Sequence, residues 1–358
     1  MFLKLGATAF GGPAAHVALM EEEFVHRRQW LSREKFLDLI ALTNLIPGPN
    51  STELAIHIGH QRAGWWGFAI AGLCFILPAF ILVTVIAYFY QKYASLPQAG
   101  SFLIGAQVVV LAIILQAFFR FFKSLFKLEQ ARDFFRRDTW SSPRASVIAF
   151  ILIGSVYLSF QSWPEITILL NCGLISLFVS RRFTVERKFE LGSLFLIFLK
   201  IGSVLFGSGY VLLTFLNSEF VEHRQWLTET QLLDAISVGQ FTPGPVFTTA
   251  SFIGYLLEGF SGAALATLGI FLPAFFFVAL TIPLYKKMSQ SLTLRLFLDG
   301  VVAGSLGLLL FTLWTFSQRL SHAPANILLF AVAFILLMRT KIPSALLILL
   351  GGLFTAFL

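Results

Sequence analysis

The chain has 358 residues, of which 57% are hydrophobic and only 12% are charged. Soluble domains carry about 25% charged residues, and apolar runs near the roughly 20 residues that cross a hydrocarbon core recur along this chain. The composition therefore predicts an all-α, multi-pass membrane protein, and the continuous runs argue against the alternating pattern of a β-barrel. No secretory leader with a cleavage site is visible, so we interpret the first apolar run as part of the fold.

The formal net charge is +8. In a soluble protein such a charge suggests nucleic acid, but here Lys and Arg gather between apolar runs, as the positive-inside bias predicts. We therefore expect membrane lipids around the chain and no nucleic-acid partner. Cys74 and Cys172 lie inside apolar runs without a CxxC partner, so neither a redox motif nor a zinc motif is predicted.

The chain is an internal duplication. After a shift of 196 positions, "KLGATAFGG" from Lys4 lies over "KIGSVLFGS" from Lys200, and "EFVHRRQWLSREKFLDLI" lies over "EFVEHRQWLTETQLLDAI". "PGPNST" matches "PGPVFT", and "FILPAF" matches "IFLPAF" after the loss of one residue. Several ordered motifs at a nearly constant offset indicate two homologous repeats, 1–185 and 186–358.

Each repeat contains the same elements in the same order. A broken apolar segment is followed by a charged stretch that ends at Ser32 or Thr228, each a candidate helix N-cap. A Pro-Gly-Pro segment, a long helix with an internal Leu-Pro-Ala, another long helix and two shorter runs follow. The expected segments are 2–20, 36–58, 67–90, 99–122, 145–160 and 164–180 in the first repeat, and 191–216, 231–257, 262–285, 296–316, 326–338 and 342–358 in the second.

The basic residues predict that the repeats are inverted. In the first repeat they crowd the loop 120–144, where alternating Phe and Lys/Arg are typical of an interfacial helix, whereas the equivalent loop of the second holds only Arg319. Opposite orientations need an odd number of crossings per repeat. We therefore expect about five crossings plus a first segment that is re-entrant, as in many transporters. The four Lys and Arg of 21–35 fit this arrangement poorly.

Four interruptions of apolar segments suggest an anion site. Pro breaks a helix interior, and a helix that restarts presents N–H groups and its positive dipole end. Brought together by a pseudo-twofold axis, such breaks form ion sites near the bilayer midplane. The alternative is that Gly and Pro only kink the helices. The interruptions are Gly11-Gly12-Pro13, Pro47-Gly48-Pro49, Gly207-Ser208-Gly209 and Pro243-Gly244-Pro245.

Polar side chains beside these breaks are further candidates for substrate binding. Hydroxyl and amide groups donate hydrogen bonds to an oxyanion without a fixed charge; the alternative is that they only satisfy backbone groups freed by the breaks. Intramembrane lysines also suit an anion, unless they extend to the headgroups. The candidates are Asn44, Asn50, Ser51, Thr52, Gln240, Thr242, Thr248 and Thr249, with the equivalent lysines Lys4 and Lys200.

A second matched set of residues is charged. We interpret it as gating or coupling residues, with structural salt bridges as the alternative. The set comprises Glu23, Arg28 and Asp38, with their equivalents Glu219, Arg224 and Asp234.

The histidines do not predict a metal site. His57 and His60 have no histidine counterparts in the second repeat, and Glu53 is the only carboxylate beside them. His16 lies just past the first break, where a proton role stays open. No nucleophile elbow, P-loop or dinucleotide fingerprint occurs in context, so we expect no cofactor and no enzyme.

These motifs resemble the chromate ion transporter family. "FLKLGATAFGGPAAH", "LIPGPNST" and "GFAIAGLCFILPAF" are similar to the first half of its long-chain, two-domain members, and "FGSGYVLL", "QFTPGPVFTTASFIGY" and "IFLPAFFFV" to the second half. Ser208 stands where the family usually has Gly. The resemblance implies a multi-pass protein of the inner membrane that exports chromate, with sulfate as a related tetrahedral dianion.

The sequence thus predicts a secondary transporter that exports chromate or a related oxyanion by alternating access. One alternative is a passive anion channel, which would share the broken helices but lack counterflow. The other is a membrane-embedded enzyme acting on lipid phosphate, which would need an acid–base or metal set. The duplication allows a functional monomer, and a homodimer is the alternative.

Overall fold

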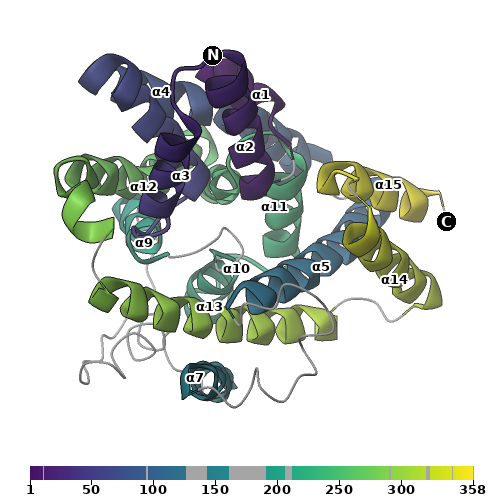
Figure 1. Cartoon of the computed structure of the whole chain (residues 1–358). Helices are drawn as coiled ribbons and strands as arrows, with labels where there is room; N and C mark the ends of the chain where they lie inside the picture. Colours follow the sequence, from purple (N-terminus) through teal and green to yellow (C-terminus); the bar gives the residue numbers. More distant parts are fainter. Residues whose placement is uncertain are drawn as a thin grey trace.

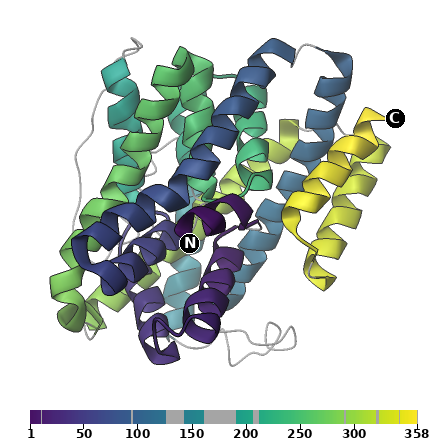
Figure 2. The ribbon, with the colours of Figure 1, turned by 90° about the horizontal axis from the view of Figure 1, so that it is seen from above.

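The computed structural model is helical throughout the part it describes (Figures 1 and 2). It describes residues 1–10, 12–93, 96–125, 143–160, 191–205, 212–289, 292–319, 323–340 and 342–357. In the first repeat the helices are α1 (Phe2–Thr8), α2 (Gly12–Glu21), the π-helix Glu22–Arg27, α3 (Arg33–Thr43), α4 (Asn50–Tyr93), α5 (Pro97–Leu125) and α7 (Pro143–Phe160). In the second they are α9 (Leu191–Val204), α10 (Leu212–Leu216), the π-helix Asn217–His223, α11 (Glu229–Phe241), the 3₁₀-helix Val246–Thr248, α12 (Thr249–Ser289), α13 (Leu292–Arg319), α14 (Pro324–Arg339) and α15 (Ser344–Ala356).

Three stretches of the described chain are long and apolar enough to cross a membrane: Asn50–Tyr93, Ala99–Arg120 and Val246–Pro283. Shorter apolar helices accompany them, among them Pro324–Arg339 and Ser344–Ala356. The prediction of an all-α, multi-pass membrane protein is confirmed. The predicted interfacial helix falls mostly on residues 126–142, and the predicted run 164–180 and Cys172 also lie outside the described residues.

Each first segment folds back on itself. Phe2, at the start of α1, packs on Phe24 beyond α2, with ring centroids 5.1 Å apart. In the second repeat, Phe198 packs on Phe220 at the same distance. The break between α1 and α2 therefore lies at the tip of a hairpin, whose base is held by buried aromatic rings.

The Pro-Gly-Pro segment makes a second hairpin. Ser32 caps α3 by accepting the N–H of Lys35, as predicted. The chain then turns through Pro47-Gly48-Pro49 into α4. Just before the bend in α4, Arg62 lies over the ring of Trp30, 5.0 Å from the centroid. Trp30 precedes α3, so the chain has returned to its point of entry, with Pro-Gly-Pro at the tip.

The long helix α4 includes more than the predicted run 67–90. It contains the second half of the Pro-Gly-Pro segment and bends at Ala63 and Gly64, where Gly64 has φ +57°. The equivalent bend in α12 is at Glu258 and Gly259, where the φ of Gly259 is +59°. Because Gly adopts positive φ without strain, both repeats reverse the chain at this point; Figure 2 shows the bent α4.

Small residues let α1 approach α4 closely. A Cβ on Gly6 would collide with the backbone of Phe75, and a Cβ on Gly202 in α9 would collide with that of Ile270 in α12. The first hairpin of each repeat is thus packed on that repeat's long helix through backbone contact, as at other small-residue helix interfaces in membranes.

The second parts of α4 and α12 pack against each other in opposite directions. Phe68 contacts Phe275, with centroids 5.6 Å apart, and Phe80 contacts Phe260 at 6.0 Å. Residue numbers therefore fall along α12 as they rise along α4. These two equivalent helices are antiparallel.

The remaining helices pack across the repeats. Helix α5 of the first repeat packs against α14 and α15 of the second, and α13 of the second packs against α7 of the first (Figure 1). Thr355 donates to the carbonyl of Ser101 between α15 and α5 at 2.6 Å. Each repeat is thus completed by helices of the other.

Candidate functional site

The two Pro-Gly-Pro turns need glycine at their centres. Gly48 has φ +136° and Gly244 has φ +93°, values that residues with a Cβ rarely adopt. A Cβ on Gly48 would also collide with the carboxylate of Glu53, and one on Gly244 would press on Ala79. The turns therefore allow a close approach of neighbouring groups at both positions.

The turns bind the first hairpin of the opposite repeat. The N–H of Gly48 donates to the carbonyl of Leu205 at 2.7 Å, and the N–H of Gly244 donates to the carbonyl of Ala9 at 3.0 Å. Ala9 and Leu205 are equivalent residues at the ends of α1 and α9. The tips of hairpins from both repeats thus meet, in a reciprocal arrangement that a twofold relation produces.

His16 connects two of these breaks. It is buried on α2, with Nε2 3.0 Å from the carbonyl of Ala9 and Nδ1 3.2 Å from Oγ of Ser51. If Nε2 carries the proton, it donates to Ala9, and Nδ1 accepts from the Ser51 hydroxyl. His16 therefore joins the first break of its repeat to the start of α4.

The predicted polar residues are mostly buried around these tips, and two keep unused donors. Oγ1 of Thr52 and Nε2 of Gln240 are buried without a hydrogen-bond partner among the described residues. Thr242, Thr248 and Thr249 instead donate to nearby backbone carbonyls. Asn50 donates to Asn44 at 2.6 Å. Buried polar groups are normally paired, so the donors of Thr52 and Gln240 have hydrogen-bonding capacity that the described residues do not use.

Glu53 is a further candidate site residue, which the sequence motifs did not single out. It lies in the first turn of α4, is fully buried, and neither of its carboxylate oxygens has a partner within the described chain. The sequence signal was an acid inside an apolar segment, which marks function by default. Sequence reasoning considered it only as a metal ligand for His57, whose Nε2 instead lies 3.4 Å from the hydroxyl of Thr281 on α12.

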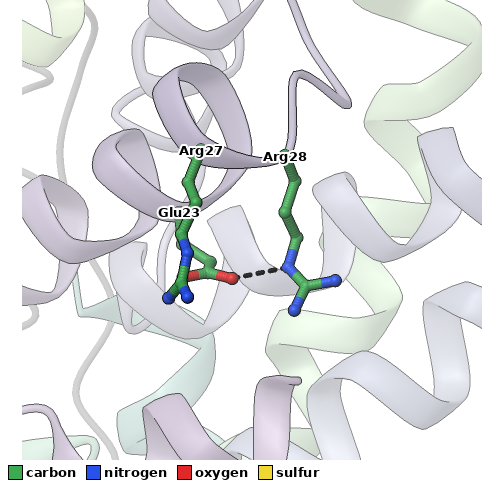
Figure 3. A network of polar contacts seen from close by, with 3 residues as sticks. All are labelled: Glu23, Arg27 and Arg28. Carbon is green, nitrogen blue, oxygen red and sulfur yellow. Dashed lines mark hydrogen bonds and ion pairs between the residues drawn. The ribbon is translucent and has the colours of Figure 1, made fainter.

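The predicted gating residues form ion pairs at the base of the first hairpins. Glu23 accepts from Nε of Arg28 at 2.5 Å and from Arg27 at 3.4 Å (Figure 3). The hydrogen bond from Arg28, together with the charges of Arg27 and Arg28, holds the pKa of Glu23 below its ordinary value. Glu219 pairs with Arg224 at 3.6 Å in the same place of the second repeat.

The two predicted lysines lie near these bases. Lys200 donates to Glu219 at 2.7 Å and is about half exposed, with 47% of its side chain accessible. Lys4 is exposed on α1. A role of either lysine in binding a substrate stays a prediction, and the structure gives Lys200 a partner of its own.

The aspartates do not share the surroundings of the ion pairs. Asp234 is buried on α11 and accepts from Tyr90 of α4 at 2.7 Å and from Gln107 of α5 at 2.8 Å. Its equivalent, Asp38, is exposed on α3. The buried aspartate thus ties the second repeat to two helices of the first.

At the first break the chain restarts as α2, with Gly12 and Pro13 in its first turn. Gly11 and the third break, Gly207-Ser208-Gly209, lie outside the described residues. The structure therefore brings together the ends of α1 and α9, both Pro-Gly-Pro turns and the polar residues beside them.

Known proteins resemble this chain along most of its length. The chain is 30% identical over 323 residues to a probable chromate transport protein of Synechococcus elongatus, covering 86% of this chain and 80% of the relative. It is 29% identical to chromate transport proteins of Cupriavidus metallidurans and Pseudomonas aeruginosa, covering 86% and 98% of this chain and 78% and 89% of those proteins. No solved structure matches the chain.

The sequence model of the chromate transporter family matches residues 1–177 and again 192–356. The two matched regions contain the equivalent hairpins whose tips meet. The chain therefore belongs to the chromate transporter family.

Proposed function

We propose that this protein is a secondary transporter that exports chromate, or a related tetrahedral oxyanion such as sulfate, across the inner membrane by alternating access. Two of the relatives above are named chromate transport proteins. The observation that carries the proposal is the meeting of interrupted segments from both repeats at Gly48, Leu205, Gly244 and Ala9.

The chemistry of this meeting place suits an oxyanion. Helix α4 begins at Asn50, and the first N–H groups of a helix have no partner within it. The positive dipole end of a helix favours an anion. The unused donors of Thr52 and Gln240 add hydrogen-bonding capacity without a fixed positive charge. Such donors hold a dianion without trapping it.

Alternating access follows if the repeats are inverted. The antiparallel contact of α4 with α12 supports this orientation, since a twofold axis that inverts repeats lies across their helices. The first hairpins, which fold back at Phe2 and Phe24 and at Phe198 and Phe220, support re-entrant segments. In inverted repeats, exchange of their two conformations opens a central site first to one side and then to the other.

The membrane potential gives the direction. A potential that is negative inside assists the exit of an anion by about 2.3 kcal/mol per charge per 100 mV. A dianion is therefore driven outward even without another coupled ion.

Everted membrane vesicles test the transport of chromate. Labelled chromate is offered outside vesicles that contain the protein, with and without excess sulfate, and vesicles without the protein serve as the control. We expect saturable uptake that sulfate reduces. Uptake no greater than in the control, with the protein demonstrably inserted, would contradict the proposal.

A further inference from the structure

We propose that Glu53 is a proton-binding residue of the anion site: its neutral carboxyl donates a hydrogen bond to the bound oxyanion, and its ionised form excludes the anion. This inference rests on the proposed function and adds a proton to what is bound. It concerns a residue to which nothing in the sequence motifs assigned a role in transport.

The position of Glu53 is the first argument. It occupies the first turn of α4, and a Cβ on Gly48 would collide with its Oε1, so the carboxyl lies against the Pro-Gly-Pro turn. The same glycine donates to Leu205 of the opposite repeat. The carboxyl is therefore located where the two repeats meet.

The lack of partners is the second argument. Glu53 is 0% exposed, and neither Oε1 nor Oε2 has a hydrogen-bond partner among the described residues. An ionised carboxylate that is buried without a partner is costly, and a proton removes that cost. Because no described protein group holds either oxygen, the protonated carboxyl is free to donate its O–H to a ligand.

The groups around Glu53 leave its charge uncompensated. On α2, His16 is occupied by Ala9 and Ser51. On its own helix, His57 lies beside Thr281 of α12. Lys35 of α3 acts electrostatically on His57. Neither carboxylate oxygen of Glu53 has a hydrogen-bond partner among the described residues.

The chemistry of a carboxyl makes it a switch for an anion. A protonated carboxyl is a donor, whereas an ionised one offers only acceptors. Two negative charges a few ångströms apart repel strongly in a medium of low dielectric constant. A dianion at the start of α4 therefore binds together with the proton of Glu53, and each stabilises the binding of the other.

This linkage defines the transported charge. A dianion that moves with one proton carries a net charge of one unit rather than two. The membrane potential still favours export, while an acidic exterior opposes it. Acidification of the cytoplasmic side should consequently promote export.

Binding of chromate at different pH values tests the inference without requiring transport. Purified wild-type protein, Glu53→Gln and the control Glu34→Gln are dialysed against labelled chromate at several pH values above neutral, where chromate stays a dianion. Glu34 is an exposed acid in the first turn of α3, so its removal changes charge at a comparable helix position. The histidines remain in all three proteins.

For the wild type and Glu34→Gln, we expect the Kd to rise with pH, at most about tenfold per unit for one linked proton. Glu53→Gln cannot ionise, so its Kd should stay constant. A Kd that rises with pH in Glu53→Gln as it does in the wild type, or a Kd that stays constant in the wild type, would overturn the inference.

If Glu53→Gln does not bind chromate, Glu53→Asp is measured instead. A pH-dependent Kd of this variant supports the inference, and a constant Kd or no binding overturns it. Wild-type protein that binds neither chromate nor sulfate would instead contradict the proposed function.

Discussion

Gly48 donates its backbone N–H to the carbonyl of Leu205, which lies in the other repeat, 2.7 Å away. The equivalent pair, Gly244 and Ala9, makes the same bond in the reverse sense at 3.0 Å. Each Pro-Gly-Pro turn thus holds the end of the opposite repeat's first helix. The candidate site is built by both repeats, and a single repeat would contain only one partner of each hydrogen bond.

The orientation of the repeats can be tested with two equivalent exposed residues. Trp66 and Ser261 follow the bends of α4 and α12. In a variant without Cys74 and Cys172, we introduce Trp66→Cys or Ser261→Cys and treat intact cells with a membrane-impermeant thiol reagent. Inverted repeats place these positions on opposite sides, so one cysteine should react and the other only after the membrane is opened. Labelling of both from the same side would contradict the inverted arrangement.

The Pro-Gly-Pro turn should not tolerate a side chain. Gly48→Ala places a Cβ against Glu53 at a positive φ, a strain of about 1–3 kcal/mol. We expect chromate uptake to fall about tenfold or more, while the protein still inserts. Gly100→Ala is the matched control, because a Cβ there has nothing within 4 Å. Equal uptake by the two variants would show that the turn is not part of the site.

The sequence was sufficient to predict the helical class, because long apolar runs are a local signal. It also predicted the Ser32 cap of α3. It could not predict that Gly48 would meet Leu205, since that contact joins residues far apart in the chain. The same limit applies to Asp234, whose partners Tyr90 and Gln107 lie on α4 and α5.

The role of Glu53 depended on information that the sequence does not contain. An acidic residue near a break can pair with a basic side chain, bind a metal ion or have no partner. Only the groups that lie around it in the fold distinguish these cases. The ion pair of Lys200 with Glu219 is a similar example. As an intramembrane lysine it suggested a substrate contact, but folding back of the hairpin brings a carboxylate within 2.7 Å.

The buried hydroxyl of Thr52 should strengthen anion binding and lower the folding stability of the ligand-free protein. This hydroxyl lacks a partner in the described chain, so Thr52→Val should leave the melting temperature unchanged or raise it. A hydrogen bond to a charged ligand contributes about 1.5–3 kcal/mol, so the Kd for chromate should rise about tenfold or more.

Thr312→Val provides the opposite control. The hydroxyl of Thr312 lies 2.5 Å from that of Thr214 in a buried pair, so its loss should lower the melting temperature and leave the Kd unchanged. Equal Kd values for wild type and Thr52→Val would remove Thr52 from the site.

Lys200 should act through Glu219. A double-mutant cycle with Lys200→Met and Glu219→Gln should give a coupling of about 0.2–1 kcal/mol in unfolding free energy, the range of exposed ion pairs. Lys4→Met serves as the comparison in the first repeat. The Kd for chromate should change less than about twofold in Lys200→Met. The ion pair with Glu219 contributes to folding stability, and a residue that does not contact the ligand changes its binding little. A large rise in Kd without coupling to Glu219 would instead place Lys200 in the substrate site.

Counterflow in proteoliposomes of the purified protein tests the central claim most directly, because it requires both an oxyanion site and alternating access. The vesicles are loaded with unlabelled chromate and diluted into a trace of labelled chromate with the potential clamped to zero. A transporter exchanges the two, so the label should accumulate transiently above its equilibrium level, and excess external sulfate should reduce this accumulation. Label that only equilibrates would indicate a channel, and label no greater than in protein-free vesicles would contradict anion transport by this protein.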